Sequence, residues 1–275
     1  MNKLLSYIMI TGLVALSITS CKKNNLVIDK EVIPPAFAKF NTLQPGDTIT
    51  THYIRSNNAP LVLPVGITNV SDQPRVINFS YSSRNAVQGT QYNAPTSITI
   101  PAGKALDSLV VTGLFAGYTS TRVDTVTITI TGGDGLTASS YKSRYHVILR
   151  KYCDVVLANL GGAYVRTFEG TYGPYTSSVT NLTSTGATTA TATITNVYDS
   201  NISMVVTFDW TNPASFRVNI NPQQTQYTSG GLPMFIRANA ASASTFSSCD
   251  NTITLRLQLY TSAAIVDTWT SSMAK

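Results

Sequence analysis

Apolar residues alternate with threonines along much of this sequence, and this period of two constrains the fold more than any other feature. In "DTVTITIT" (124–131), Val126, Ile128 and Ile130 fall on one face and the threonines on the other. Such alternation is expected of a β-strand with one buried face. The same signal recurs to the end of the chain without one persuasive helix. We therefore predict an all-β protein.

The predicted strands fall into two groups. The first comprises 48–55, 61–70, 75–82, 97–100, 107–114, 124–131 and 145–152. Short strands with turn signals between them predict an immunoglobulin-like sandwich, which we place at 36–152. The second comprises 163–169, 176–184, 188–198, 202–210, 215–220, 233–238, 252–260 and 265–272. We predict an antiparallel barrel at 153–275, because closure removes exposed strand edges. A second sandwich is the alternative.

The amino terminus has the features of an export signal. Residues 1–20 contain a positive start, an apolar run and small residues before a cut site, which predicts a signal peptide. The run is shorter than the about 20 apolar residues that a membrane helix needs. Ile18, Thr19 and Ser20 precede Cys21 and resemble the bacterial lipobox, in which the cysteine is acylated. We expect lipidation at Cys21, palmitate among the acyl chains, and a lipidated tether at 21–35, since several chains anchor a protein durably. A secreted protein with a chance cysteine is the alternative.

The charge pattern argues against a nucleic-acid partner. The formal net charge is +6, and only 12% of residues are charged, about half the usual quarter. A nucleic-acid binder gathers lysines and arginines on one face with interleaved aromatic residues. Here the basic residues are scattered, with Lys22 and Lys23 beside the lipid anchor. We expect that pair to be attracted to anionic lipid headgroups.

Two cysteines remain after Cys21. In an oxidising compartment, Cys153 and Cys249 are expected to form a disulfide. The alternative, a zinc or catalytic cysteine, lacks partners, because no CxxC spacing occurs and the chain has only two histidines. We predict no metal and no cofactor.

Catalytic patterns are equally sparse. His52 and His146 both lie within predicted strands, and neither adjoins a nucleophile motif such as GxSxG. Glycoside hydrolysis needs two facing carboxylates. Glu169 and Asp209 are candidates for facing each other across a barrel mouth, but nothing in their spacing requires it. We predict a protein that is not an enzyme and has no catalytic residues.

Binding is the favoured class of function. Sugars stack on aromatic rings and hydrogen-bond to amides, and both kinds of side chain occur in two expected loops, "GTYGPYTS" (170–177) and "NPQQTQYTSGG" (221–231). The candidate glycan-binding residues are Tyr172, Tyr175, Gln224 and Tyr227, with Gln223 and Gln226 beside them. One alternative is a lipocalin-like carrier of an apolar ligand, in which Trp210 lines the barrel interior. A structural protein-interaction module is the other.

A longer segment resembles a known family. In "NAVQGTQYNAPTSITIPAGKALDSLVV" (85–111), a GxxY segment leads to an apolar strand and a PAG turn. The matching residues are Gly89, Tyr92, Ile98, Ile100, Pro101, Ala102 and Gly103. This pattern resembles the Calx-beta-like sandwich near the amino terminus of many Bacteroidetes outer-membrane lipoproteins, over about residues 36–152. The second half is similar, more weakly, to lipocalin-like or sandwich domains of the same lipoproteins.

The resemblance implies a lipid-anchored protein of the outer membrane, on its periplasmic face or at the cell surface. Many of the relatives serve glycan uptake beside outer-membrane transporters, which makes a transporter complex an expected partner. Calcium-binding members carry acidic clusters before the final strands. This chain has "FAGYTSTRVD" (115–124) there, with Asp124 alone, so calcium binding is not expected.

The first prediction concerns the anchor. Replacing Cys21 with Ala should release the protein from membranes or leave it uncleaved, because the acyl chains have no other attachment point. Detergent-phase partitioning and mass spectrometry check this. A Cys21→Ala variant that still enters the detergent phase with the mature mass would contradict the lipoprotein interpretation.

Overall fold

The computed structural model describes residues 35–43 and 48–275, and these are almost entirely strands. The predicted all-β fold is therefore confirmed. The predicted signal peptide, Cys21 and nearly all of the tether lie outside the described residues. Within the described ranges, no helix has both the length and the apolar character to cross a membrane.

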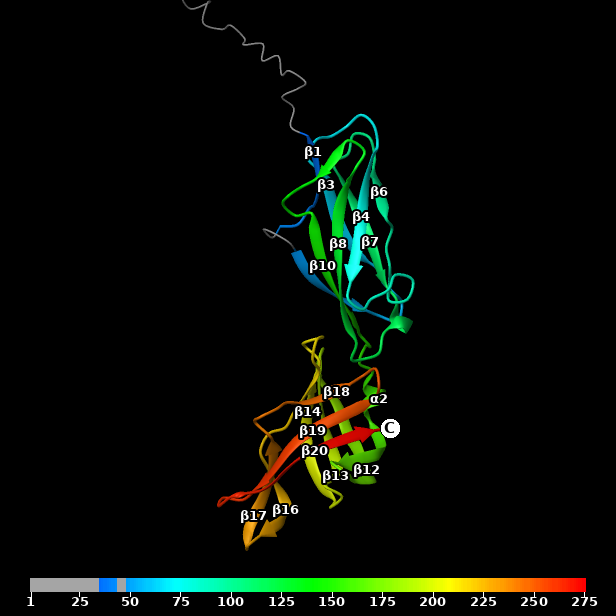
Figure 1. Ribbon diagram of the computed structural model, residues 1–275. Coiled ribbons are helices and arrows are strands. Elements are labelled where there is room, and N and C mark those ends of the chain that lie inside the picture. Colours follow the sequence, from blue (N-terminus) through cyan, green and yellow to red (C-terminus); the bar gives the residue numbers. More distant parts are fainter. Residues whose placement is uncertain (1–34, 44–47) are drawn as a thin grey trace, which may run out of the picture. The chain divides into compact units, whose positions relative to one another are not determined.

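The described strands pair in two sets, coloured blue to green and green to red in Figure 1. The first set contains β1 (Ala36–Phe40), β2 (Thr48–Ile54), β3 (Leu61–Ile67), β4 (Arg75–Ser83), β5 (Tyr92–Asn93), β6 (Ser97–Ile100), β7 (Leu106–Gly113), β8 (Val123–Gly133), β9 (Leu136–Ala138) and β10 (Arg144–Lys151), with a 3-10 turn η2 (Phe115–Gly117). Its order is β2-β10-β8-β9-β1-β3-β7-β5, and β4 pairs with β6 and β8. The β2–β10 pair is parallel, so the sheet is mixed.

The first set has the predicted sandwich character, because alternate side chains of its strands are buried. Val126, Ile128 and Ile130 of β8 are buried, as are Leu109 and Val111 of β7. The threonines between the β8 residues point away from this core, as a period of two requires. The alternation that defines the sequence thus builds the sandwich interior.

The second set forms a closed barrel. It contains α2 (Leu157–Leu160), β11 (Gly162–Glu169), β12 (Tyr172–Gly186), β13 (Thr189–Val197), β14 (Ile202–Asp209), β15 (Arg217–Asn219), β16 (Gln223–Ser229), β17 (Leu232–Ala238), β18 (Ser244–Ser247), β19 (Thr252–Tyr260) and β20 (Ile265–Ala274). Strand β20 pairs with β11 on one side and β19 on the other, which closes an antiparallel ring of β11, β12, β13, β14, β15, β18, β19 and β20. The predicted barrel is confirmed, and the alternative of a second sandwich is wrong.

The barrel is not a simple meander. The β16–β17 hairpin pairs with β19 outside the closed ring and extends away from it in Figure 1. Its turn consists of Gly230 and Gly231, both with positive φ, as a tight two-residue hairpin requires. The ring closes past this hairpin because β15 pairs directly with β18.

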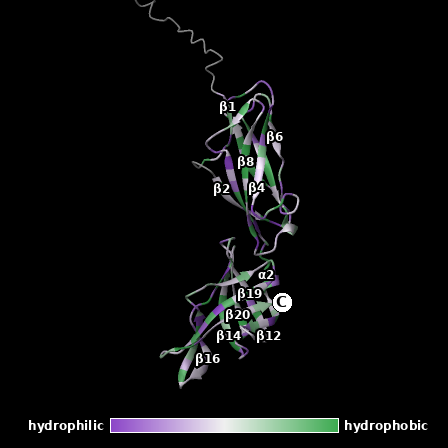
Figure 2. Cartoon of the chain, viewed as in Figure 1, coloured by the Kyte–Doolittle hydropathy of each residue, from purple (hydrophilic) through white to green (hydrophobic). Residues whose placement is uncertain are grey.

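Side chains of the barrel strands fill its interior. Hydrophobic and hydrophilic residues are interspersed along these strands (Figure 2). The inward hydrophobic residues form one buried cluster that includes Ile194, Val206, Phe208, Phe246 and Leu255. The rings of Phe208 and Phe246 meet edge to face with centroids 5.1 Å apart. An eight-stranded ring is just wide enough for side chains to fill, and here they do so.

The two expected binding loops are largely strand, which corrects the sequence prediction. Tyr172 and Tyr175 lie in β12, and Gln224 and Tyr227 lie in β16. In both hairpins the turn takes only two residues, since Glu169 pairs with Tyr172 and Ser229 pairs with Leu232. The glycines mark the turns themselves, and the threonine- and tyrosine-rich segments beside them take the extended backbone that such residues favour.

The predicted domain boundary at 152/153 falls between the two sets of strands, in the segment that joins β10 to α2. Each set pairs its strands internally, and the division into two domains stays a prediction. In terms of contacts, Phe37–Lys275 forms one compact unit.

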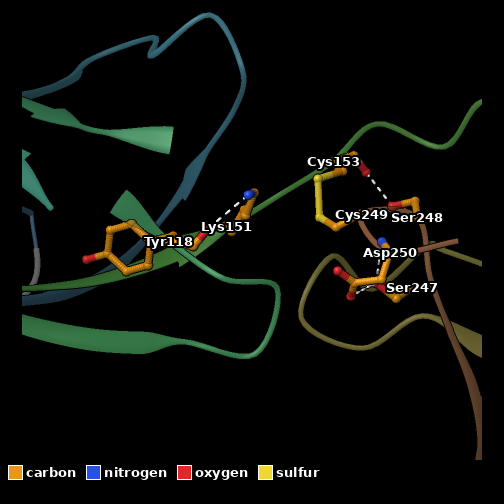
Figure 3. The surroundings of a disulfide bond; sticks show 7 residues. All are labelled: Tyr118, Lys151, Cys153, Ser247, Ser248, Cys249 and Asp250. Atoms are coloured by element: carbon orange, nitrogen blue, oxygen red, sulfur yellow. Dashed lines mark hydrogen bonds between the residues drawn. A yellow bond between two sulfur atoms is a disulfide. The ribbon is translucent and has the colours of Figure 1, made fainter. Parts of the chain in front are cut away.

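Cys153 and Cys249 form a disulfide, with their Cα atoms 5.2 Å apart (Figure 3). The bond ties the segment before α2 to the turn between β18 and β19. Beside it, the Ser248 hydroxyl donates a hydrogen bond of 2.7 Å to the Cys153 carbonyl oxygen. The expected pairing is present in the structure.

The second prediction tests this bond. It closes a loop of 96 residues, and the chain-entropy model gives about 4.7 kcal/mol for a loop of this size. We expect a reductant to lower the melting temperature of the wild-type protein markedly. The Cys153→Ala/Cys249→Ala double variant is the control, because its melting temperature should already be low and should not respond to reductant. Equal sensitivity of both proteins to reductant would contradict the account.

Candidate functional site

The candidate site lies at one open end of the barrel, where the inward row of β20 leaves the hydrophobic core. Met273 and Ser271 are buried, and Trp269 and Asp267 follow them on the same face at the spacing of alternate strand residues. On the neighbouring strand, Leu257 pairs with Trp269 and Leu259 with Asp267. Trp269 packs against the barrel's hydrophobic cluster. The row therefore changes from apolar to polar at this end, which we call the barrel mouth.

The barrel mouth contains a pocket of about 420 Å³, within the range usual for small-ligand sites. It is lined by Glu169, Tyr172, Tyr198, Asp199, Ser200, Asp267 and Trp269. These residues come from the β11–β12 hairpin, the turn between β13 and β14, and β20. Three aromatic rings and three carboxylates thus converge from segments far apart in the sequence.

Each carboxylate of the pocket accepts a hydrogen bond from a tyrosine hydroxyl. The Tyr172 hydroxyl donates to Asp199 Oδ2 at 2.7 Å, and the Tyr198 hydroxyl donates to Asp267 Oδ2 at 2.6 Å. The Tyr175 hydroxyl, just outside the lining, donates to Glu169 Oε1 at 2.5 Å. Because a tyrosine hydroxyl donates to each of the three carboxylates, their positions are fixed.

The turn between β13 and β14 has an unusual backbone. Asn196, Tyr198, Asp199 and Asn201 have φ between 42° and 63°, in the left-handed region. Asparagine tolerates this region, whereas a bulky residue such as Tyr198 adopts it at a cost of about 1 kcal/mol or more. Such residues are held in place by their surroundings, and they concentrate at binding and catalytic sites. Here the turn directs the Tyr198 ring at Trp269, with centroids 4.8 Å apart in an edge arrangement.

Contacts from two neighbouring strands hold this turn. The Asn196 amide donates to the Thr176 carbonyl oxygen of β12 at 2.8 Å. From β16, the Tyr227 hydroxyl donates to the Ser200 carbonyl oxygen at 2.5 Å, and the Gln226 amide donates to Asn201 at 3.1 Å. The β16–β17 hairpin therefore supports the pocket although it lies outside the closed ring.

Burial and hydrogen bonds shift the pKa values of the mouth residues. Burial raises the pKa of Glu169, although the hydrogen bond from Tyr175 favours the charged form. The hydrogen bond to Asp267, with burial, raises the pKa of Tyr198 to about 12. Burial and the hydrogen bond to Glu169 also raise the pKa of Tyr175. The indole N–H of Trp269 is buried and makes no hydrogen bond of ordinary geometry. Its interaction with Glu169 nevertheless acts to lower the pKa of that carboxyl group, against the effect of burial.

The structure brings together three of the five predicted ligand-binding residues. Tyr172 lines the pocket, Tyr175 positions Glu169, and Tyr227 holds the turn at Ser200. Gln224 is exposed on β16 and is not part of the pocket lining. Trp210 packs against the hydrophobic cluster beside Phe246 with ring centroids 6.5 Å apart, so it belongs to the core.

Glu169 and Asp209 do not face each other. Glu169 lies at the β11–β12 hairpin, whereas Asp209 pairs with Thr189 at the far ends of β13 and β14. Asp209 instead accepts a hydrogen bond of 2.9 Å from the Thr211 backbone N–H. The two carboxylates therefore occupy opposite ends of the barrel.

Four residues of the pocket are not predicted from the sequence, namely Tyr198, Asp199, Asp267 and Trp269. A signal was present in "NVYDSN" (196–201), where asparagines and aspartate flank a tyrosine in the pattern of a turn. Asp267 and Trp269 gave no local signal, because only the pairing of β20 with both β19 and β11 brings them to the mouth.

In the first set, Asp124 is buried and forms an ion pair with Arg122, whose Nε–H donates a hydrogen bond of 2.8 Å to Asp124 Oδ2. An arginine thus supplies the positive charge beside the one acid that the family comparison singled out. Over the described ranges, no group of three or more histidine, cysteine or acidic residues is placed to hold a metal ion.

Comparisons with known proteins find solved structures at low identity and low TM-score. No family model and no curated protein matches the sequence. The apo form of the Calx CBD1 domain is 10% identical, with 42% of this chain aligned to 96% of that chain at a TM-score of 0.33. A protein of unknown function from Bacteroides ovatus is 12% identical over 86% of this chain and 89% of its own, also at 0.33. A proposed carbohydrate binding protein from Bacteroides ovatus ATCC 8483 is 9% identical, with 84% of this chain aligned to 69% of that chain at a TM-score of 0.35.

Likeness of this size carries no ligand or activity over to this chain.

The third prediction concerns Glu169. Because burial raises its pKa, the folded state binds a proton there more tightly than the unfolded chain does. The stability that this group contributes is present below its unfolded pKa and is lost as the pH rises through the folded value. Glu169→Gln should therefore raise the melting temperature at about pH 7 and change it little at about pH 3.5.

The matched control is Asp209→Asn, which changes a carboxylate at the end of the barrel opposite the mouth. The hydrogen bond from the Thr211 backbone lowers the pKa of Asp209, so this variant should not gain stability at neutral pH. Thermal unfolding followed by circular dichroism measures both. A Glu169→Gln variant that is less stable than wild type at neutral pH would contradict the burial argument.

Proposed function

We propose that this chain is a non-catalytic binding module that takes glycan at the barrel mouth. The observation that carries the proposal is the pocket of about 420 Å³, in which three aromatic rings adjoin three hydrogen-bond acceptors with fixed positions. The apolar C–H face of a sugar stacks on an aromatic ring, and its hydroxyls donate to acceptors at the side of the ring. Trp269 supplies a supported surface, since it rests on the hydrophobic cluster.

The filled interior favours the mouth over a deeper ligand site. A lipocalin-like carrier needs a cavity inside the ring, whereas the buried cluster that fills this barrel has members on all eight strands of the ring. Trp210, the residue expected to line such a cavity, packs beside Phe246. We therefore propose a ligand that remains at the surface, in place of an apolar ligand carried inside the barrel.

The acids of the pocket are assigned to recognition. Glycoside hydrolysis needs one carboxylic acid and one carboxylate on either side of the scissile bond. In this pocket all three acids are engaged with tyrosine hydroxyls, an arrangement that suits fixed acceptors better than proton transfer.

The cellular setting is part of the same proposal. Cleavage and acylation at Cys21 would anchor the protein in the outer membrane through residues 21–35, on the periplasmic face or at the cell surface. A glycan-binding module in that position would hold polysaccharide near a transporter. Partnership with an outer-membrane transporter accordingly belongs to the proposal.

The fourth prediction tests the pocket with Tyr172→Ala. Affinity electrophoresis in gels containing β-glucan, xylan, mannan or chitosan first selects the polysaccharide that retards the protein most. Calorimetry on oligosaccharides of that polymer should then show a loss of about tenfold or more, since truncating an anchor commonly costs about 2 kcal/mol or more. Tyr172 is 59% exposed, so its removal should leave the melting temperature nearly unchanged.

The matched control is Tyr141→Ala, which removes another exposed tyrosine, 51% accessible, from the segment before β10. It should bind like the wild type. Equal affinities for all three proteins would contradict a site at the barrel mouth. Shortened saccharides appearing after incubation with the protein would contradict the non-catalytic assignment.

A further inference from the structure

The barrel mouth gathers three acidic side chains with no basic side chain in its lining. Glu169, Asp199 and Asp267 line one pocket, and none of the lining residues is a lysine, arginine or histidine. In the described part of the chain, the ion pairs lie elsewhere, at Arg122 with Asp124 and Arg55 with Asp154. The formal net charge of the whole chain is +6, so the pocket opposes the sign of the protein as a whole.

Burial raises the pKa of Glu169, and the charge of Asp199 acts in the same direction, whereas hydrogen bonds from Tyr175, Tyr198 and Trp269 act against it. The hydrogen bond to Asp267, burial and the charge of Asp267 together raise the pKa of Tyr198. The neighbouring acids of the pocket therefore give the mouth a negative field. A ligand with a positive group gains from this field, whereas a uronic or sulfated sugar is repelled by it.

The aromatic lining adds to this preference. The faces of Trp269, Tyr198 and Tyr172 carry negative electrostatic potential, which attracts a cation placed over a ring. Tyr198 and Trp269 meet edge to face at 4.8 Å, so two ring planes of different orientation border the same space. Rings and carboxylates together make a surface suited to an ammonium group on an apolar frame.

Acceptor capacity remains after the internal hydrogen bonds are made. Glu169 uses Oε1 for the Tyr175 hydroxyl, and Asp267 uses Oδ2 for Tyr198 and Oδ1 for the Thr268 backbone N–H. A carboxylate oxygen has two lone pairs, so each can accept a second donor, and a primary ammonium has three donors to place. A metal ion fits less well, since the described acids form no group placed to hold one.

We propose that the barrel mouth binds a sugar residue carrying a protonated primary amine, its ring stacked on Trp269 and its ammonium group placed among Glu169, Asp199 and Asp267. This inference rests on the proposed glycan-binding function and names the class of glycan. An N-acetylated sugar of the same backbone lacks the charge, and a neutral sugar has a hydroxyl at the same position.

The fifth prediction compares three β-1,4-linked tetrasaccharides by calorimetry at about pH 6, namely those of glucosamine, N-acetylglucosamine and glucose. The glucosamine tetramer should bind at least about tenfold more tightly than the other two, because ion pairing and cation–π attraction add to stacking. Raising the salt concentration should weaken this preference, since the mouth is open to solvent at Tyr172 and Asp199.

Two variants locate the preference. Asp267→Asn and Asp199→Asn keep an acceptor for the tyrosine hydroxyl and remove the charge, so each should reduce the preference for the glucosamine tetramer. Asp209→Asn, at the other end of β14, should retain it. Circular dichroism verifies that each variant is folded.

Different results separate the two proposals. Equal binding of all three tetramers, or tighter binding of a neutral one, would overturn the amino-sugar inference and leave the glycan site in place. A glucosamine preference that survives both pocket variants would also overturn it. Absence of binding by any tetramer overturns the inference, while the polysaccharide gels and Tyr172→Ala judge the glycan proposal separately.

Discussion

Closure of the barrel through β20 is the interaction on which the rest of the candidate site depends. The backbone of β20 pairs with β19 along nearly the whole length of the strand and with β11 near the carboxyl terminus. This double pairing gives β20 an inward face that runs from buried Met273 to Asp267 at the mouth. Without it, the side chains of Trp269 and Asp267 would have no fixed relation to the β11–β12 hairpin or to the β13–β14 turn. The pocket is therefore a consequence of closure.

The turn between β13 and β14 supplies three residues of the mouth pocket, Tyr198, Asp199 and Ser200. Its left-handed residues are unfavourable by themselves, and hydrogen bonds from β12 and β16 offset that cost. The result is a tyrosine, Tyr198, whose ring meets Trp269 and whose hydroxyl fixes Asp267. Because the barrel interior is filled by side chains, a ligand can use this rigid rim only from outside. The arrangement is consistent with surface binding of part of a longer chain.

The sequence predicts the strands well because alternation is a local property. The period of two locates strands such as β8, β14 and β19, and the presence of Cys153 and Cys249 predicts the disulfide. The sequence also identifies Tyr172, as an aromatic residue in a segment expected to bind ligand. It does not predict Trp269 or Asp267, because their place at the mouth depends on the pairing of residues 271–274 of β20 with residues 166–169 of β11, more than one hundred positions earlier in the chain. Nor does it predict that Tyr227 supports the turn at Ser200 and does not line the pocket. Non-local pairing leaves no local pattern.

The chain has two tryptophans, which report on opposite ends of the barrel and allow the central claim to be measured directly. Trp269 lies in the mouth pocket, and Trp210 packs beside Phe246 at the other end. In a Trp210→Phe variant all tryptophan emission comes from Trp269, and titration with the glucosamine tetramer should change it saturably. In a Trp269→Phe variant the same titration should leave the emission of Trp210 unchanged. Saturable binding in calorimetry that alters only the emission of Trp210 would contradict a glycan site at the barrel mouth.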